Sequence, residues 1–375
     1  MIIPLSGRID SSNAAETESA LREKIGSASG EIVLDAADLT YISSAGLRVI
    51  LRLKKDNADT SVINCCPEVY DILDMTGFTE MMEVKRAYRK LSLEGCEKLG
   101  EGSNGVVYRF DPDTIVKVYK NPDSLDEIHR ERELARKAFV MGIPTAIPYD
   151  VVQVGELYGS VFELLNAKSF SKLLNEGENV DALAKQSIDI LKTIHTTTLK
   201  AGELPSKKAE ACGWAAFCAP ELPAEIAQKL TAMFEEIPET LNMLHGDYHI
   251  KNIMRQGNEN LLIDMDTLSV GHPIYELSQM YLAYLGFSEL KPEEIKHFLG
   301  IDHETAAAFW NSSLKFYFEG QPQAAIDDAV LKARIIGYAR LLRRTLRREP
   351  GNAALIAHCK TQLCAHVPQV DTLYF

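Results

Sequence analysis

The stretch LHGDYHIKN, at residues 244–252, constrains the fold of this chain more than any other feature. Two short apolar runs follow it, NIMRQ and NLLID, with a glycine and an asparagine between them. Two such runs around this kind of turn are typical of a β-hairpin. A hairpin of this length returns to the point where its first strand begins. We therefore predict that Asp247, Asn252 and Asp264 lie together at one end of a hairpin.

These three side chains suit a particular chemistry. Asp247 and Asn252 have the D-x-x-x-x-N spacing of a kinase catalytic loop. The side-chain oxygens of Asn252 and Asp264 are the kind of ligand that Mg²⁺ prefers, and Asp247 is left to take the proton from an attacking hydroxyl. The alternative is three polar loop residues at the ends of a hairpin.

The segment LGEGSNGVVYRF contains Gly100, Gly102 and Gly105, with Ser103 between the last two. The G-x-G-x-x-G pattern is weak by itself. The residues after it are β-branched and aromatic, which favours a strand over the helix of a dinucleotide-binding fold. A strand, a glycine turn and a second strand are typical of the hairpin that covers ATP phosphates in kinases. We predict that these glycines and Ser103 contact ATP.

A single lysine, Lys117, lies in the middle of the next apolar run, IVKVY. A charge in such a strand is costly unless it is paired. The helix predicted over SLDEIHRERELARKAFVMG offers Glu127 and Glu131 on one face. We predict that Glu131 pairs with Lys117 and that the lysine holds the ATP phosphates. The alternative is a surface hairpin with a solvated lysine.

The charge balance argues against a nucleic-acid partner. The formal net charge is −13; residues 1–88 hold 9 Lys and Arg against 14 Asp and Glu, which leaves −5 there and −8 in the rest. Both parts would repel a phosphate backbone. No stretch resembles a membrane span or a secretory signal. The seven scattered cysteines suit free thiols in a reducing compartment, so we expect a cytoplasmic protein without a membrane partner.

The chain divides into three parts by pattern. Residues 1–88 alternate short apolar strands with amphipathic helices, which predicts an α/β domain. Residues 89–165 have the pattern of strands with tight turns, and residues 166–375 are mostly helical in pattern. A chain of 375 residues accommodates two or three domains.

The segment LHGDYHIKNIM…LLIDMDTLSVGHP resembles the aminoglycoside phosphotransferase/choline kinase family of kinase-like enzymes. The H-G-D-x-H-x-x-N and I-D motifs of that family fall on His245, Gly246, Asp247, His249, Asn252, Ile263 and Asp264. The resemblance implies a bilobal protein-kinase-like fold, with an N-lobe at 89–165 and a helical C-lobe at 166–375. It also implies transfer of the γ-phosphate of ATP to a hydroxyl of a small molecule with Mg²⁺, and an adenine site at the backbone of Glu163 to Leu165.

The motif departs from the protein-kinase pattern in ways that favour a small acceptor. Gly246 stands where protein kinases have an arginine that senses activation-loop phosphorylation, DMD replaces D-F-G, and no A-P-E follows. The stretch GHPIYEL has His272 and Glu276 where the family usually carries aspartate, so the fine geometry of the loop is open. Asp266 either assists metal binding or is solvated.

The stretch EIVLDAADLTYISSAGLRVIL contains a strand, an Asp-containing loop, two serines and an amphipathic helix. It resembles the STAS domain of bacterial anti-sigma-factor antagonists. The resemblance implies a regulatory domain that docks an anti-sigma-factor-like or other signalling protein. Aligning on Gly46 carries the phosphorylated serine of that family to Ser44, with Ser43 in place of the usual aspartate. A phosphate there would meet free N–H groups at a helix start; the alternative is that Ser43 or Ser44 is only a helix cap.

The helix predicted over YARLLRRTLRRE carries a basic stripe. Its members, spaced i, i+3, i+4, i+7 and i+8, are Arg340, Arg343, Arg344, Arg347 and Arg348. A solvated face is the usual meaning of such a stripe. The sharper interpretations are a dock for the acidic first domain or for an anionic substrate. Trp214 is compatible with either a substrate pocket or the core.

Three functions are compatible with these motifs. The first is an ATP- and Mg²⁺-dependent phosphotransferase that acts on a small hydroxyl compound and carries a regulatory STAS domain. The second is a protein serine kinase whose target is Ser44, in the same chain or on a partner. The third is a non-enzymatic scaffold that binds a nucleotide and signals through the STAS surface. The sequence does not identify the acceptor.

Overall fold

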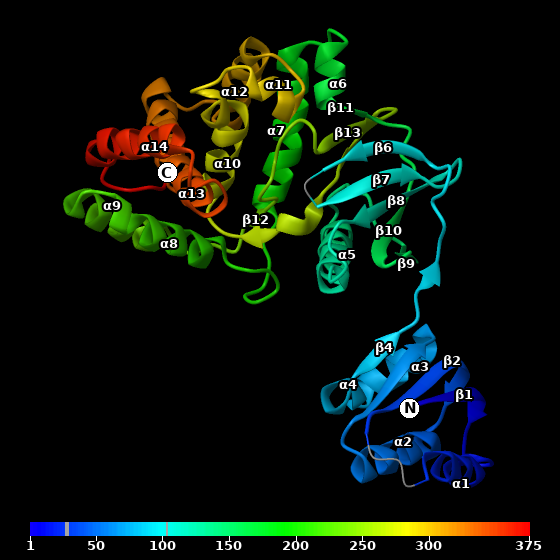
Figure 1. Ribbon diagram of the computed structural model, residues 1–375. Coiled ribbons are helices and arrows are strands. Elements are labelled where there is room, and N and C mark those ends of the chain that lie inside the picture. Colours follow the sequence, from blue (N-terminus) through cyan, green and yellow to red (C-terminus); the bar gives the residue numbers. More distant parts are fainter. Residues whose placement is uncertain (27–29, 103) are drawn as a thin grey trace. The chain divides into compact units, whose positions relative to one another are not determined.

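The computed structural model describes residues 1–26, 30–102 and 104–375 (Figure 1). It contains two compact units, one formed by Met1–Gly95 with Val151–Gly159 and the other by Cys96–Asp150 with Ser160–Phe375. The boundaries at residues 88 and 165 stay predictions. Within the described residues, no helix has the length and apolar character needed to cross a membrane.

The first unit is built on a parallel sheet, as its alternating pattern predicts. The strands are β1 (Ile2–Ile9), β2 (Ile32–Ile42), β3 (Thr60–Cys65) and β4 (Val84–Arg86), in that spatial order. The helices between them are α1 (Ala14–Ile25), α2 (Ser44–Asp56), α3 (Pro67–Met75) and α4 (Phe78–Met81) (Figure 1). The α/β class predicted for this part is confirmed.

Helix α2 shows why the serine-rich stretch folds as it does. Ser43 is the N-cap, and its hydroxyl accepts a hydrogen bond from the N–H of Ala45 at 3.2 Å. The buried face of the helix consists of Gly46, Leu47, Val49, Ile50 and Leu53. A Cβ on Gly46 would lie 2.7 Å from a carbon of the Ile42 side chain. Only glycine therefore lets the first turn of α2 pack this closely on the sheet.

A six-stranded sheet forms the next part of the chain. Its spatial order is β5 (Arg89–Lys90), β9 (Asp150–Val154), β10 (Leu157–Glu163), β8 (Thr114–Tyr119), β7 (Gly105–Arg109) and β6 (Glu97–Glu101). β7 pairs antiparallel with both β6 and β8. Helix α5 (Leu125–Val140) follows β8 and lies beside the strands of this sheet (Figure 1).

The rest of the chain is mostly helical, as predicted. The helices are α6 (Phe170–Asn175), α7 (Val180–Thr196), α8 (Lys207–Cys218), α9 (Ala224–Glu236), α10 (Ile274–Tyr284), α11 (Glu294–Leu299), α12 (His303–Tyr317), α13 (Gln323–Arg348) and α14 (Ala353–His366). Every residue of α10 is buried, so this helix runs through the centre of the core. Trp214 is also buried, at 1% exposed.

Two small sheets lie at the ends of the loop 245–252 and of the segment 263–268. The first contains β11 (Lys168–Ser169), β13 (Ile253–Gln256) and β14 (Glu259–Leu262), and the second pairs β12 (Met243–Leu244) with β15 (Ser269–Val270). β13 and β14 form the predicted hairpin, with Ile253 opposite Leu262. The loop 245–252 therefore runs from β12 to β13, and the segment 263–268 returns from β14 to β15.

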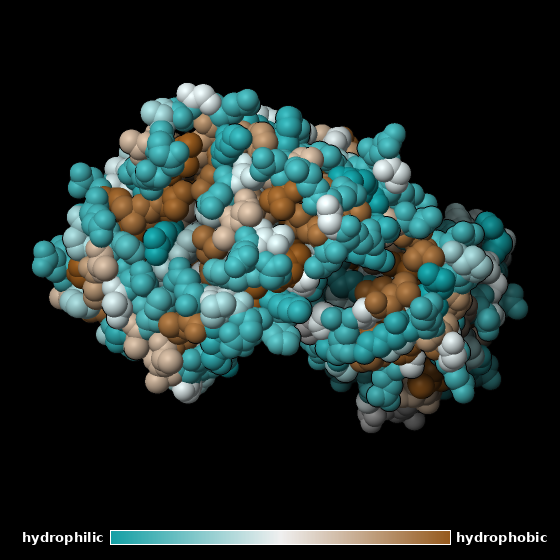
Figure 2. All heavy atoms as spheres, turned by 90° about the horizontal axis from the view of Figure 1, so that it is seen from above, coloured by the Kyte–Doolittle hydropathy of each residue, from teal (hydrophilic) through white to brown (hydrophobic). Residues whose placement is uncertain are grey.

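The face of the molecule seen in Figure 2 is largely hydrophilic, with separate hydrophobic patches. Large hydrophobic side chains that are exposed include Met75, Phe139 and Val140. Scattered exposure of this kind is normal for a folded protein, and it does not by itself define a binding site.

Candidate active site

Asp247 lies in the loop between β12 and β13, with its side chain 33% exposed. Its carboxylate accepts a hydrogen bond from Nε2 of Gln279 at 2.9 Å, and Nε2 of His249 lies 3.5 Å away. Burial raises the pKa of Asp247, but the hydrogen bond from His249 and the charges of His249, His245 and Arg340 outweigh it and hold the pKa at about 2. Asp247 is therefore ionised and able to accept a proton.

Asn252 is fixed by the same loop. Its side-chain amide donates to the backbone oxygen of Asp247 at 2.9 Å, and its own backbone oxygen accepts from the N–H of Ile263 at 3.0 Å. Because the amide N–H₂ is held in this way, Oδ1 is the atom left to meet a ligand. The second bond also brings the segment that carries Asp264 beside the loop.

Asp264 has an unusual backbone. Its φ is +64°, in the left-handed region, and it is one of two non-glycine residues with positive φ among the described residues. Its carboxylate lies 3.5 Å from Nζ of Lys117, and the side chain is 42% exposed. Strain of this kind persists where the surrounding structure fixes it, often at functional sites.

Lys117 and Glu131 are close together. Nζ of Lys117, on β8, lies 2.9 and 3.0 Å from the two carboxylate oxygens of Glu131, on α5, and the hydroxyl of Tyr119 donates to the same carboxylate. Burial lowers the pKa of Lys117, but the charges of Glu131 and Asp264 outweigh it and raise the pKa. Glu127 lies elsewhere and accepts from the amide of Asn104 at 3.3 Å.

The glycine segment is a hairpin of β6 and β7, as predicted. The N–H of Gly102 donates to the oxygen of Gly105 at 2.9 Å, and Nζ of Lys120 donates to the oxygen of Gly102 at 3.0 Å. A Cβ on Gly105 would lie 2.7 Å from the oxygen of Val118, so that position requires glycine. Gly100 is the fourth residue of β6. Ser103 lies outside the described residues.

The segment expected to face adenine, Glu163 to Leu165, begins at the last residue of β10. The N–H of Leu164 is already used, because it donates to the oxygen of Asp113 at 2.7 Å. Glu163 is exposed and Leu165 is half-buried. Their roles in nucleotide binding stay predictions.

Glu276 holds the backbone of the loop 245–252. In the sequence, this residue is recognisable only as a departure from the family pattern. The residue is 1% exposed, and its carboxylate accepts the N–H groups of His245 and Gly246 at 2.5 and 3.0 Å. Gly246 has φ +84°, and a Cβ there would lie 2.4 Å from the oxygen of Thr267. No arginine could occupy this position without moving the loop. Glu276 is the only charged residue of α10, at its third position, and a lone acid in such an apolar helix is the signal that could have found it.

Gln279 and Arg340 form a chain of hydrogen bonds that begins at Asp247. Gln279 is 4% exposed in α10; its amide donates to Asp247, and its oxygen accepts from Nη1 of Arg340 in α13. The interpretation of the arginine stripe as a solvated face is therefore wrong for Arg340. No sequence pattern pointed to Gln279, because the contact joins helices that are far apart in the chain.

The residues present fit a Mg²⁺ ion that shares its coordination with phosphates. Asn252 and Asp264 supply oxygen donors, and the half-buried Asp266 lies near them; its pKa is raised to about 7 by burial and by the charges of Asp264 and Glu131. A cation would relieve that repulsion. No group of three or more His, Cys, Asp or Glu in the described part of the chain forms a metal cage. Mg²⁺ is commonly held by one or two carboxylates plus substrate phosphates.

Comparison with known proteins identifies both parts of the chain. The model of the family described as "Phosphotransferase enzyme family" matches residues 95–309, and the STAS domain model matches residues 1–91. A Bordetella bronchiseptica protein named as an anti-sigma factor antagonist, BtrV, is 32% identical over 88 residues, which are 22% of this chain and 76% of that protein.

Solved aminoglycoside phosphotransferases share the fold. A thermostable mutant of APH(4)-Ia in ternary complex with AMP-PNP and hygromycin B has a TM-score of 0.53 and 14% identity, over 73% of this chain and 93% of that one. ADP-bound APH(2'')-Ib has a TM-score of 0.50 and 17% identity, over 81% and 99% of the two chains. The GDP and kanamycin complex of APH(2'')-IIia has a TM-score of 0.50 and 14% identity, over 80% and 98%.

These matches confirm the kinase-like fold and the STAS-like region that the motifs predict. The family match includes the loop 245–252, the hairpin and the glycine segment, and it ends before α13 begins. The chain therefore belongs to the phosphotransferase enzyme family and carries a STAS domain at its N-terminal end.

Proposed function

We propose that the second unit transfers the γ-phosphate of ATP to a hydroxyl of a small molecule. The observation that carries the proposal is the convergence of an ionised Asp247 with Asn252, Asp264 and the Lys117–Glu131 pair. These groups come from four places in the chain, namely β8, α5, the loop 245–252 and the segment 263–268. Their arrangement matches the division of labour in kinases, which use one proton acceptor, oxygen donors for the metal and a lysine for the phosphates.

Each residue would have a defined role in the transfer. Lys117 would bind ATP phosphates while Glu131 fixes its ammonium group, and Asn252 and Asp264 would hold Mg²⁺. When bound, Mg²⁺ neutralises part of the negative charge of the phosphates. The acceptor oxygen forms a bond to the γ-phosphorus, the bond from that phosphorus to the β–γ bridging oxygen breaks, and the hydroxyl proton goes to Asp247.

The test is ATP turnover with a panel of amino sugars, choline-like amines, sugars and sugar acids. We expect Asp247→Asn to lower kcat on the best acceptor by about 10² to 10⁴-fold. Asp189→Asn is a matched control, because Asp189 is exposed on α7 and pairs with Lys185 at 2.8 Å, outside the site. Equal turnover by the wild type and the Asp247→Asn variant would reject the proposal. Detectable ATP binding without transfer to any acceptor would favour the scaffold function.

The nucleotide itself needs a direct test, because the structural neighbours hold adenine nucleotides or GDP. We propose ATP. Competition between ATP and GTP at equal concentration, read from the phosphorylated product, measures the preference. A higher kcat/KM with GTP would change the nucleotide and leave the phosphotransfer proposal intact.

For the first unit, we propose docking of an anti-sigma-factor-like or other signalling protein that regulates the phosphotransferase. Ser44 is exposed at the first position of α2, directly after the capping Ser43. That exposure favours a second candidate function, phosphorylation of Ser44 by this chain or by a partner kinase. Intact mass after incubation with ATP and Mg²⁺ tests it, with Ser44→Ala as the control. An unchanged mass, together with turnover of a small acceptor, would leave only the docking role.

A further inference from the structure

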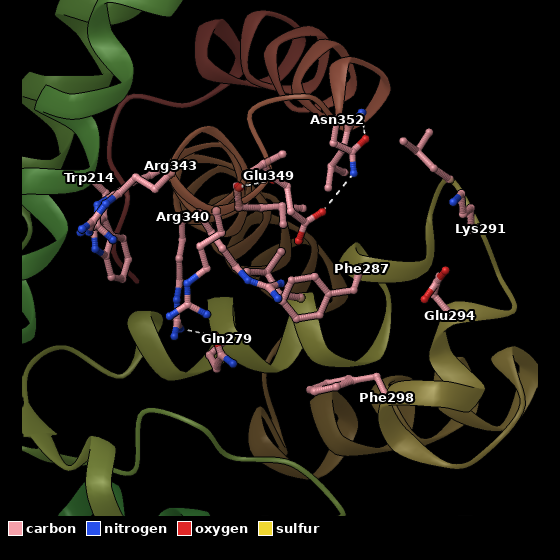
Figure 3. A pocket seen from close by; sticks show the side chains of 18 of the residues that line it. Trp214, Gln279, Phe287, Lys291, Glu294, Phe298, Arg340, Arg343, Glu349 and Asn352 are labelled. Carbon is pink, nitrogen blue, oxygen red and sulfur yellow. Dashed lines mark hydrogen bonds between the residues drawn. The ribbon is translucent and has the colours of Figure 1, made fainter. Parts of the chain in front are cut away.

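A pocket of about 1050 Å³ lies in the helical part of the second unit, and Asp247 is among the residues that line it. Its other lining residues come mainly from α8, α10, α11, α13 and α14 (Figure 3). A volume of this size is at the upper end of ordinary small-molecule sites. The residue proposed to accept the hydroxyl proton therefore borders a space large enough for the acceptor.

The pocket carries an excess of cations in an acidic protein. The basic residues that line it are Lys291, Arg340, Arg343, Arg344, Arg347 and Arg348, and the acidic ones are Glu210, Asp247, Glu294 and Glu349. Six cations against four carboxylates leave an excess of two, whereas the whole chain has a net charge of −13. This local reversal of sign would attract an anion and repel a cation.

Among the described residues, none of the five arginines of α13 that line the pocket forms an ion pair with a carboxylate within 4.0 Å. The charges of Glu210, Asp247 and Glu276 act on Arg340, which is partly buried. One of the acids already has a cationic partner, because Glu210 pairs with Lys207 at 2.7 Å. The exposed Arg344, Arg347 and Arg348 are thus the cations available to a ligand.

Aromatic rings orient two of the guanidinium groups. Arg340 lies over the ring of Trp214, 5.5 Å from its centre, and Arg344 lies over Phe287 at 5.2 Å. Figure 3 shows Arg340 meeting Gln279, the residue that also holds Asp247. Arg344 and Arg347 are exposed one and two turns further along α13. A guanidinium beside an aromatic ring keeps N–H groups that can bind a planar or tetrahedral oxyanion, although one of those of Arg340 is used by Gln279.

We propose that the acceptor is a hydroxyl compound that also carries a phosphate, sulfate or carboxylate group. Arg344 and Arg347 bind the anionic group, and the acceptor hydroxyl lies at Asp247. This inference rests on the proposed function, because it identifies the substrate class of the same site. A cationic amino sugar does not suit this pocket, since it would lie against the arginine-rich face of α13.

The first test compares acceptors that differ only in charge. Glycerol 3-phosphate is paired with glycerol, and glucose 6-phosphate with glucose, and kanamycin serves as the cationic probe. We expect the anionic member of at least one pair to have a kcat/KM at least about tenfold above its neutral partner and above kanamycin. A neutral or cationic compound as the best acceptor overturns the proposal.

The second test removes the charge from the pocket. In the double variant Arg344→Gln/Arg347→Gln, we expect the KM of the anionic acceptor to rise about 10- to 100-fold, with kcat and the KM of a neutral acceptor nearly unchanged. Lys315→Gln is the matched control, because Lys315 is exposed on α12, lies over the ring of Phe316 and does not line the pocket.

The same variants answer the question without turnover. Each protein is titrated with inorganic phosphate, glycerol 3-phosphate or glucose 6-phosphate, and its thermal unfolding is measured. We expect the anions to raise the unfolding temperature of the wild type and of Lys315→Gln more than that of the double variant. An equal response of all three proteins to every anion overturns the proposal. If Asp247-dependent turnover is instead fastest with cations, only this inference fails; if Asp247→Asn has no effect on turnover, the proposed function fails.

Discussion

The loop 245–252 and the arginine face of α13 border the same pocket, but the family model matches only the loop. The family match covers residues 95–309, so it includes the loop and excludes α13. The loop is held by short backbone contacts, such as the bond between Asn252 and Ile263 at 3.0 Å. The arginine face is held by contacts between helices. We propose that the reaction depends on the loop, which lies inside the family match, and that the choice of acceptor depends on α13, which lies outside it.

Helix α10 connects the two regions. Gln279 contacts Asp247 on one side and Arg340 on the other, and Glu276 holds the N–H groups of the loop. Helix α10 therefore positions Asp247, the proposed proton acceptor, and also contacts Arg340 beside the proposed anion site. Variants that affect one region but not the other test this division.

The largest effect should come from Lys117, which lies on the nucleotide side. Lys117→Met removes the cation beside the phosphates, so kcat/KM for ATP should fall about 10² to 10³-fold. The KM of the acceptor should stay the same. Steady-state kinetics with each substrate varied in turn measures both. Lys168→Met is the control, because Lys168 pairs with Glu176 on the surface. A large rise in the KM of the acceptor would break the division between the two regions.

The next effect concerns the loop itself. Gly246→Ala places a Cβ 2.4 Å from the oxygen of Thr267 at φ +84°, so we expect a loss of about 2 to 4 kcal/mol in unfolding free energy. Gly257→Ala is the matched control, since Gly257 also has positive φ, +59°, but open space around it, and should lose only about 1 kcal/mol. Urea unfolding of both variants checks the difference. Equal losses would mean that the contact with Thr267 does not constrain the loop.

A smaller effect should follow from the connection through α10. Gln279→Ala removes the hydrogen bond to Asp247 and frees Arg340, so we expect kcat to fall about tenfold and the KM of an anionic acceptor to change as well. Gln323→Ala, at the exposed start of α13, should leave both unchanged. If Gln279→Ala changes neither constant, the two regions act independently.

The smallest effect lies in the STAS domain. Ser43→Ala removes the cap of α2, so the unfolding free energy of that domain should fall by about 1 kcal/mol. Ser44→Ala should change it by less, because no hydrogen bond of the Ser44 side chain holds the helix in the described structure. Thermal unfolding of both variants measures the difference. The reverse order would assign the cap to Ser44.

Local sequence patterns predicted the elements that depend on neighbouring residues. The hairpin of β13 and β14, the hairpin of β6 and β7, and the amphipathic α2 follow from alternation, turns and capping. The pair of Lys117 with Glu131 was predicted because a charge in an apolar strand needs a partner and the next helix offers Glu131. The contact of Lys117 with Asp264 was not predicted.

The remaining features depend on packing between distant segments. Gln279 lies in α10, whose residues are all buried, so its sequence shows no polar face that would mark a site. The partial burial of Arg340 arises from the way α13 packs on α10 and α8. Trp214 was compatible with a pocket or with the core, and it is both buried and part of the pocket lining. Such positions require the tertiary structure.

The most direct test of the central claim is mass spectrometry of the acceptor after incubation with ATP, Mg²⁺ and either the wild type or Asp247→Asn. We predict one added phosphate on the hydroxyl compound with the wild type and almost none with the variant, while both proteins bind ATP. A phosphorylated acceptor in equal yield from both proteins would contradict the role of Asp247, and with it the proposed mechanism of phosphate transfer.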